Sequence, residues 1–237
     1  MDRRLLHEIE HGRRISAEAD TAWERTGKAN AVRLKRKADM LLRGIGPRQT
    51  VLEVGCGTGL LTAELAKTGA KIYAIDISPD LLSLARERVK SSEVEFFCAN
   101  AYSLAFEEKT FDFVIGLSVL HHLDIDRALC EFWRVLREGG KVVFSEPNML
   151  NPQIILERSF FRKYFKNSPD ETAFIRFLLK RKLEKIGYKN VIIYPFDFLH
   201  PRTPDFLTGY VDALSRLLEK VPVISEIAGS LYIETTK

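Results

Sequence analysis

Three glycines alternate with other residues in the stretch Gly55-Cys56-Gly57-Thr58-Gly59, and a carboxylate residue, Glu53, precedes them. Glycine lacks a Cβ atom and adopts positive φ angles, so a ligand can approach the backbone amides here. The apolar residues Val51 to Val54 favour a buried strand, and Leu60 to Lys67 favour a helix. The N–H groups at the start of that helix favour a carboxylate or another electron-rich group. We therefore predict a nucleotide-type binding site at the end of this strand.

A second carboxylate, Asp76, ends the next predicted strand, Ile72 to Ile75. At the carboxyl end of a neighbouring parallel strand, a carboxylate can accept hydrogen bonds from both hydroxyl groups of a ribose. Asp76 could instead cap the following helix, but Ser78 and Pro79 already supply a cap and a first-turn proline. We expect Asp76 to bind a ribose.

The glycine spacing differs from the Gly-x-Gly-x-x-Gly pattern of dinucleotide-binding proteins. The whole stretch from Val51 to Gly59 instead resembles the first motif of the class I, Rossmann-like S-adenosylmethionine (SAM)-dependent methyltransferases of small molecules. This resemblance implies SAM as the cofactor and a seven-stranded sheet whose last strand is antiparallel. It also implies cofactor contacts from residues that follow successive strands, namely Glu53, Gly55, Cys56, Gly57, Gly59, Asp76, Ile77, Asn100, Ala101 and Leu117.

Two further stretches strengthen the resemblance. Residues Ala99 to Phe106 are similar to the family's Asp-Ala-x-x-Leu-Pro-Phe segment, and Leu136 to Lys141 to its Leu-x-Pro/Glu-Gly-Gly-x pattern. In the family the acid of the former segment accepts from the adenine amino group, and the next backbone N–H meets a ring nitrogen. Asn100 replaces that acid here, and its amide oxygen can still accept the amino hydrogen.

Two adjacent histidines follow the fourth predicted strand, Phe111 to Leu117, in a stretch that resembles the Val-Leu-His-His-Leu sequence of small-molecule methyltransferases. The resemblance places this stretch where the reactive methyl group should be. If the acceptor must lose a proton, we expect His121 or His122 to be the base. The alternative is that one histidine packs or caps. We predict no metal, because the sequence places no third ligand beside the pair.

Four further residues are candidates for contacting the substrate. Glu146 and Asn148 follow the fifth predicted strand, Lys141 to Ser145, at the edge of the sheet that should bind the cofactor. Trp23 on an N-terminal helix could close over the cofactor, although packing is the alternative. His200 could orient the substrate or lie at the surface in a turn.

The alternation of strand and helix patterns predicts one doubly wound α/β domain at residues 44–237, with a mostly parallel sheet and helices on both faces. Residues 1–43 read as an N-terminal helical cap with a break around Gly27. The aromatic and basic segment 149–170 reads as a helical lid, with a peripheral membrane contact as the sharper alternative. Segment 196–225 reads as the second half of a substrate pocket.

The composition of the chain narrows the classes of molecule that it is expected to bind. The formal net charge of +4 is too small to indicate nucleic acid. The charged start of the chain and the absence of a long apolar run predict a cytoplasmic protein, and Cys56, Cys98 and Cys130 read as reduced thiols. We expect methyl transfer to O, N or C of a small or amphipathic acceptor. A non-catalytic SAM-binding protein and an NAD-dependent oxidoreductase are the alternatives, and the sequence specifies neither the acceptor nor the oligomeric state.

Overall fold

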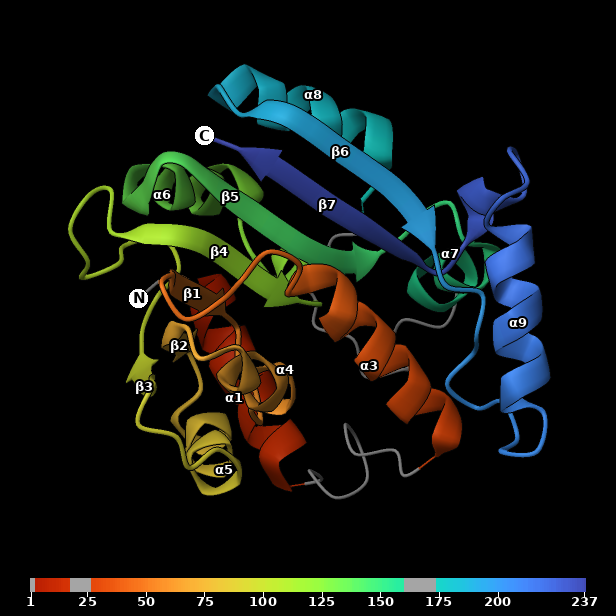
Figure 1. Cartoon of the computed structure of the whole chain (residues 1–237), viewed down its shortest axis with the longest axis horizontal. Coiled ribbons are helices and arrows are strands. Elements are labelled where there is room, and N and C mark those ends of the chain that lie inside the picture. The colour runs from red at the N-terminus through yellow and green to blue at the C-terminus, as the bar shows by residue number, and fades with distance from the viewer. Residues whose placement is uncertain (1–2, 18–26, 160–173) are drawn as a thin grey trace.

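The computed structural model describes residues 3–17, 27–159 and 174–237 of the chain. Seven strands form one sheet in the order β3-β2-β1-β4-β5-β7-β6 (Figure 1). Neighbouring strands pair in parallel from β3 to β5, and β7 runs antiparallel between β5 and β6. The predicted sheet with an antiparallel last strand is confirmed. The strands in chain order are β1 Thr50–Val54, β2 Lys71–Asp76, β3 Val94–Cys98, β4 Phe111–Leu117, β5 Leu136–Pro147, β6 Lys189–Phe196 and β7 Ser230–Thr236.

Helices cover both faces of the sheet, as predicted. Helices α3, α4 and α5 pack on one face, and α6 and α8 pack on the other (Figure 1). None of the described helices is both long and apolar enough to cross a membrane. The helices are α1 Arg3–Ala17, α3 Lys28–Leu41, α4 Leu60–Leu65, α5 Pro79–Arg88, α6 Ile125–Val135, α7 Pro152–Ser159, α8 Arg176–Ile186 and α9 Thr208–Leu218, with short 3₁₀ turns η1 Ala66–Thr68, η2 Leu120–His122 and η3 Ser225–Ile227.

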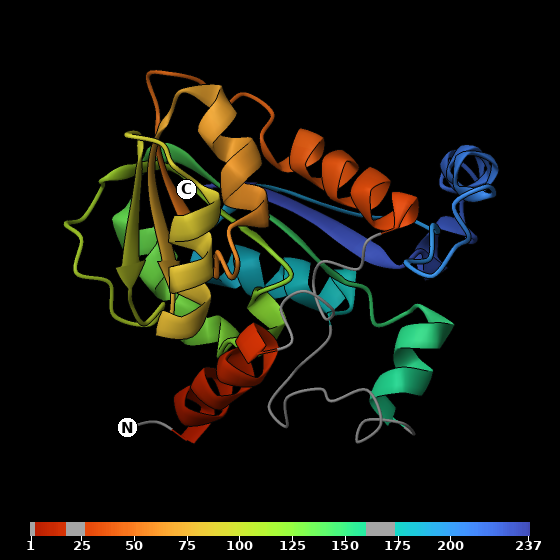
Figure 2. The same cartoon turned by 90° about the horizontal axis from the view of Figure 1, so that it is seen from below.

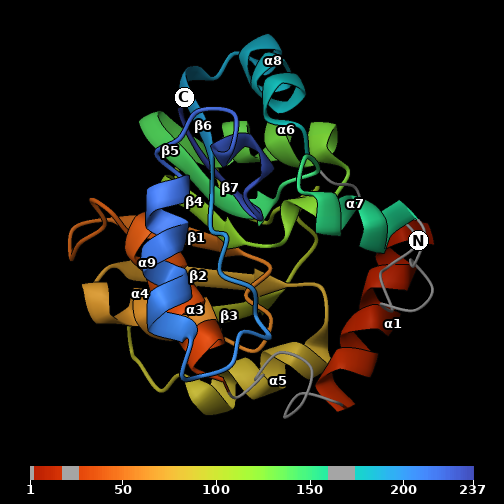
Figure 3. The same cartoon turned by 90° about the vertical axis from the view of Figure 1, so that its right-hand side faces the viewer.

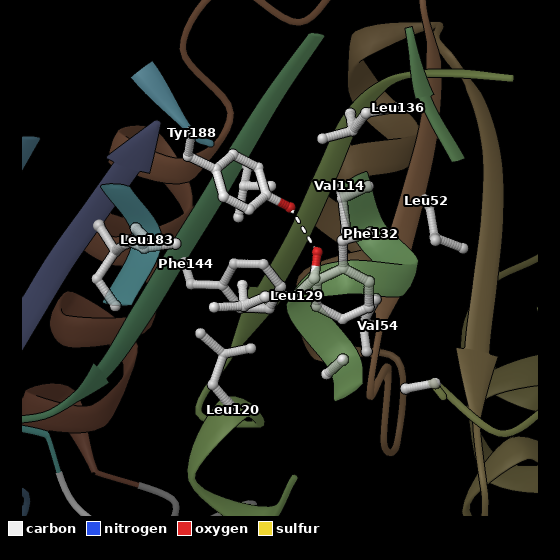
Figure 4. Close-up of a cluster of buried hydrophobic side chains, with 14 of the residues drawn as sticks. Leu52, Val54, Val114, Leu120, Leu129, Phe132, Leu136, Phe144, Leu183 and Tyr188 are labelled. Atoms are coloured by element: carbon white, nitrogen blue, oxygen red, sulfur yellow. Dashed lines mark hydrogen bonds between the residues drawn. The ribbon is translucent and has the colours of Figure 1, made fainter. Parts of the chain in front are cut away.

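The α6 face of the sheet contains an aromatic core (Figure 4). The rings of Phe132 and Phe144 lie stacked with centroids 5.9 Å apart, and both side chains are fully buried. Tyr188 is buried beside them and donates its hydroxyl hydrogen to the backbone oxygen of Leu129 at 2.9 Å. This burial raises the pKa of the phenol, which stays protonated as a donor. The core fixes α6, and therefore the loop before it, against the sheet.

The two N-terminal helices occupy different places. Helix α3, whose N-cap is Gly27, packs on the sheet against α4, β4 and β5. Helix α1 lies beyond the carboxyl ends of the strands and contacts α5 (Figure 2). Among the described residues of the predicted N-terminal cap, α1 therefore lies over the strand ends where ligands bind in such sheets, whereas α3 does not.

Three predicted segments differ from the structure in their limits. The sequence favours a turn at Glu138-Gly139-Gly140 before the fifth strand, but these residues lie inside β5 as a bulge, since Leu136 pairs with Phe111 but Lys141 pairs with Phe113. The sequence also favours a helix at Glu171 to Ile186; residues 171–173 lie outside the described residues, and α8 begins at Arg176, after Phe174 forms a bridge with Asn148. The lid predicted at 149–170 contains α7, and the remainder of it from residue 160 lies outside the described residues.

Candidate active site

The glycine loop between β1 and α4 presents its backbone to a pocket at the carboxyl ends of β1, β2 and β4. Gly57 lines the pocket with a φ of +54°, and a Cβ atom there would meet nothing within 4 Å. Gly55 has a φ of +65°, and a Cβ atom there would lie 2.3 Å from Cγ2 of Val119. Glycine at 55 thus lets the loop after β4 approach closely, and glycine at 57 leaves an open backbone for a ligand.

Asp76 joins this loop to the start of α5. Its Oδ2 accepts a hydrogen bond from the N–H of Gly57 at 2.9 Å, and its Oδ1 accepts from the N–H of Ser78 at 2.9 Å. Burial raises the pKa of this carboxyl group, although the two backbone hydrogen bonds act in the opposite direction. A carboxylate has about four lone-pair sites, so both oxygens retain the capacity to accept from a ligand. The helix cap predicted at Ser78 is confirmed, since its hydroxyl accepts from the N–H of Leu81.

Glu53 provides a second carboxylate on the pocket wall, at the end of β1. Only 1% of its surface is exposed, and burial raises its pKa to about 7, against a smaller opposing effect of the Thr62 hydroxyl. Oε2 of Glu53 has no partner in hydrogen-bonding geometry among the described residues. A buried acceptor without a donor is costly, so this oxygen is suited to a ligand that brings a hydroxyl or ammonium group.

A third carboxylate, Glu146 on β5, holds the loop after β4 by accepting hydrogen bonds from its backbone. Its Oε1 accepts from the N–H groups of Val119 and Leu120, both at 2.9 Å. Its Oε2 lies 2.7 Å from Nδ1 of His121, which is itself buried. Neither Glu146 nor His121 lines the pocket. Glu146, predicted as a substrate contact, instead supports the turn η2 that carries both histidines.

His122 lines the pocket, and a carboxylate from the N-terminal helix lies beside it. Its Nδ1 is 2.9 Å from Oε2 of Glu8 on α1, and the side chains of both residues are nearly buried. Its ring centroid is 4.1 Å from that of His121 and 5.8 Å from that of His11. The structure therefore adds Glu8 and His11 to the site, which sequence reasoning missed.

Helix α1 closes one side of the pocket through residues that share one helix face. The spacing of Leu5, Glu8, Gly12 and Ile15 by three, four and three positions is typical of such a face and could have indicated it. At the crossing with α5, a Cβ atom on Gly12 would lie 2.6 Å from both Cβ and Oγ of Ser78. The helix is thus seated at a distance that only glycine allows.

The pocket collects every predicted cofactor residue except Gly59. A Cβ atom on Gly59 would lie 3.1 Å from Cα of Ala85, so this glycine serves the packing of α4 against α5. Cys56 lines the pocket, but burial raises the pKa of its thiol, which is unsuited to a nucleophile. The amide oxygen of Asn100 accepts from the N–H of Tyr102 at 3.0 Å, which orients the amide at the pocket wall.

Two of the remaining predicted substrate residues, Asn148 and His200, do not line the pocket. Asn148 is buried and donates to the backbone oxygens of Glu226 and Ala228, both at 2.8 Å. His200 accepts from the N–H of Arg202 in a turn and does not line the pocket. Trp23 lies outside the described residues. Within the described ranges, no three His, Cys, Asp or Glu side chains gather as metal ligands.

The sequence of this chain is similar to those of known methyltransferases. Residues 52–144 match the family model of the methyltransferase domain. The chain is 31% identical over 188 residues to a demethylmenaquinone methyltransferase of Bacillus mycoides, covering 69% of this chain and 79% of that protein. It is 37% identical over 112 residues to the Tropheryma whipplei protein of the same name, but that match covers only about half of either chain, 47% of each.

Two solved structures share the fold at low sequence identity. A SAM-dependent methyltransferase of Thermotoga maritima, described as a possible histamine N-methyltransferase, aligns with a TM-score of 0.69 and 18% identity, covering 97% of this chain and 99% of that one. A phosphoethanolamine N-methyltransferase of Haemonchus contortus in complex with SAM aligns with a TM-score of 0.62 and 17% identity, covering 94% and 60%.

Proposed function

The chain belongs to the class I SAM-dependent methyltransferases, and we propose that it methylates a small, largely apolar acceptor of the quinol type. The membership follows from the match to the methyltransferase domain and from the relative that shares 31% identity over most of both chains. It favours methyl transfer over the oxidoreductase alternative. That the protein is located in the cytoplasm remains a prediction from the sequence.

The residues of the pocket fit SAM. The observation that carries this assignment is the unpartnered Oε2 of buried Glu53, which we assign to the ammonium group of the methionine part. Asp76 has spare acceptor sites for the ribose hydroxyls, and the open backbone at Gly57 admits the ligand between them. We assign the adenine ring to the wall formed by Asn100 and Ala101. When bound, SAM supplies a methyl group activated on a sulfonium.

The chain's own contribution is to orient the acceptor and exclude water. Such alignment of reactants is worth up to roughly 7 to 11 kcal/mol. Helix α1 covers one side of the pocket, which would shield the reacting atoms from solvent.

We assign proton transfer to His122, for an acceptor that must lose a proton. Oε2 of Glu8 lies 2.9 Å from Nδ1 at ion-pair distance but outside hydrogen-bonding geometry, and its negative charge favours a proton on Nδ1, which leaves Nε2 as the basic atom. A histidine so held can contribute about 100- to 10,000-fold. We assign His121 a positioning role, because its ring is buried against Glu146 and outside the pocket lining.

The acceptor class rests on the wall around His122 and on the relatives. Apolar side chains from α1, from the end of β4 and from the loop after β4 line the pocket together with His122, among them Leu5, Ile15, Leu117, Val119 and Leu123. Such a wall suits a flat apolar ring that carries a hydroxyl group. The relatives are named for demethylmenaquinone, which is a substituted naphthoquinone.

Transfer of labelled methyl from SAM to a reduced 1,4-naphthoquinone tests this proposal. Histamine and phosphoethanolamine serve as amine acceptors of a different chemistry in parallel reactions. Label in the naphthoquinol supports the proposed class, whereas label only in an amine refutes it. SAM binding by calorimetry without label in any acceptor, or in an extract, would favour the non-catalytic SAM-binding alternative.

A further inference from the structure

Helix α9 turns its apolar face to solvent. More than half of the large apolar side chains that are exposed among the described residues lie between Phe206 and Ile227. Tyr210, Leu214 and Leu217 on the helix itself are 78%, 53% and 60% exposed. The helix lies at the front of the molecule in Figure 3, connecting β6 to β7. An exposed apolar surface of this kind marks a binding site for another molecule.

The opposite face of α9 is held to the body by polar contacts. Ser215 is buried, and its hydroxyl accepts from the N–H of Phe198 at 2.8 Å and donates to Oε1 of Glu219 at 3.0 Å. Glu219 also accepts from the guanidinium of Arg36 on α3 and from the N–H of Asp197, each at 2.8 Å. This network prevents α9 from rotating its apolar residues inward without losing buried hydrogen bonds.

The spacing of the exposed residues suits another helix. Leu207, Tyr210, Leu214, Leu217 and Val221 follow one another by three, four, three and four positions, which is the a/d spacing of helices that pack side by side. With side chains of roughly 150 to 200 Å² each, these five residues expose about 500 Å² of apolar surface, and the flanking Phe206, Val223 and Ile224 bring the exposed apolar area to on the order of 800 Å². A stable interface needs about 800 Å² from each partner.

The charges around this face favour a neutral partner over a membrane. Residues 201–221 contain three basic and three acidic side chains, Arg202, Arg216, Lys220, Asp205, Asp212 and Glu219. Helices that lie on anionic membranes carry an excess of lysine and arginine on the polar face, whereas the charges here balance and the polar residues Ser215 and Glu219 of this segment are bound to other elements of the protein. Two copies of a balanced surface can approach each other without repulsion.

We propose that this face is the interface between two copies of this chain, with α9 of one copy packed on α9 of the other about a twofold axis. Such an isologous contact uses the same patch twice and buries both apolar faces at once. The site pocket lies at the strand ends beneath α1, so the pairing leaves it open.

Sedimentation velocity of the full chain at micromolar concentrations tests the proposal. The wild type is expected at twice the monomer mass, and the double substitution Leu214→Glu with Leu217→Glu should weaken the pairing at least roughly 100-fold. The matched control is Phe177→Glu with Leu178→Glu on α8, where the exposed fractions are 52% and 58%, and it should remain a dimer. Circular dichroism checks that both variants keep the fold.

Three results would overturn the proposal: a monomeric wild type, a dimer that survives the α9 substitutions, or equal dissociation of the α8 control. A monomer that instead binds phosphatidylcholine and phosphatidylglycerol vesicles, and loses this binding with the α9 substitutions, would assign the face to a membrane.

Discussion

Replacing Gly12 by alanine should weaken SAM binding without weakening the fold. The added Cβ atom would lie 2.6 Å from both Cβ and Oγ of Ser78, at the crossing of α1 and α5. Ser78 cannot move aside easily, because its hydroxyl caps α5 and its N–H donates to Asp76. We therefore expect α1 to be displaced from the pocket.

The magnitude follows from the cost of overpacking. Forcing an extra methyl group into a tight contact costs about 1 to 3 kcal/mol, which corresponds to roughly 5- to 150-fold in affinity. Within the helix itself, alanine is about 1 kcal/mol more favourable than glycine. The substitution should thus leave the melting temperature of the ligand-free protein nearly unchanged while the dissociation constant for SAM rises.

Isothermal titration calorimetry with SAM measures this effect. The matched control is Gly209→Ala on α9, where an added Cβ atom meets nothing within 4 Å. The control makes the same glycine-to-alanine change in a helix without the clash, so its SAM affinity should equal that of the wild type. Unchanged affinity in Gly12→Ala would show that α1 does not close the site as argued, and an equal loss in both variants would exclude the contact with Ser78 as the cause.

Four other substitutions test the pocket and the turn that supports it. Asp76→Asn replaces one acceptor oxygen by an N–H group that must face a backbone donor, so SAM affinity should fall by roughly 10- to 100-fold in calorimetry; an unchanged affinity would contradict the ribose assignment. Because burial raises the pKa of Glu53 to about 7, ionisation of this group increasingly destabilises the ligand-free fold as pH rises from the unfolded pKa through 7. Glu53→Gln should then stabilise the fold by on the order of 1 to 3 kcal/mol at pH 8 and by less at pH 5 in urea denaturation, and a pH-independent difference would refute the reasoning. His122→Ala should lower turnover by roughly 100-fold or more with unchanged SAM affinity, whereas His121→Ala should mainly lower the melting temperature; a larger loss of turnover in His121→Ala would reverse these roles.

Local features of this chain could be predicted because each depends on neighbouring residues. The strand, glycine loop and helix around Gly57 are specified by hydrophobic period and by backbone freedom within a dozen positions. The acid Asp76 follows the adjacent parallel strand, so the pairing of β1 with β2 brings it to the same edge. The fold, and the gathering of most predicted cofactor residues around one pocket, were therefore predictable from the sequence.

Contacts between distant segments were not predictable in this way. Glu8 contacts His122 although more than a hundred residues separate them in the sequence. Glu146 does not line the pocket, because its carboxylate accepts hydrogen bonds from backbone N–H groups at the turn η2. Alternating apolar spacing also does not say which way a helix faces. On α9 the buried hydrogen bonds of Ser215 and Glu219 to other elements turn the polar side inward, and only this tertiary network leaves the apolar side exposed.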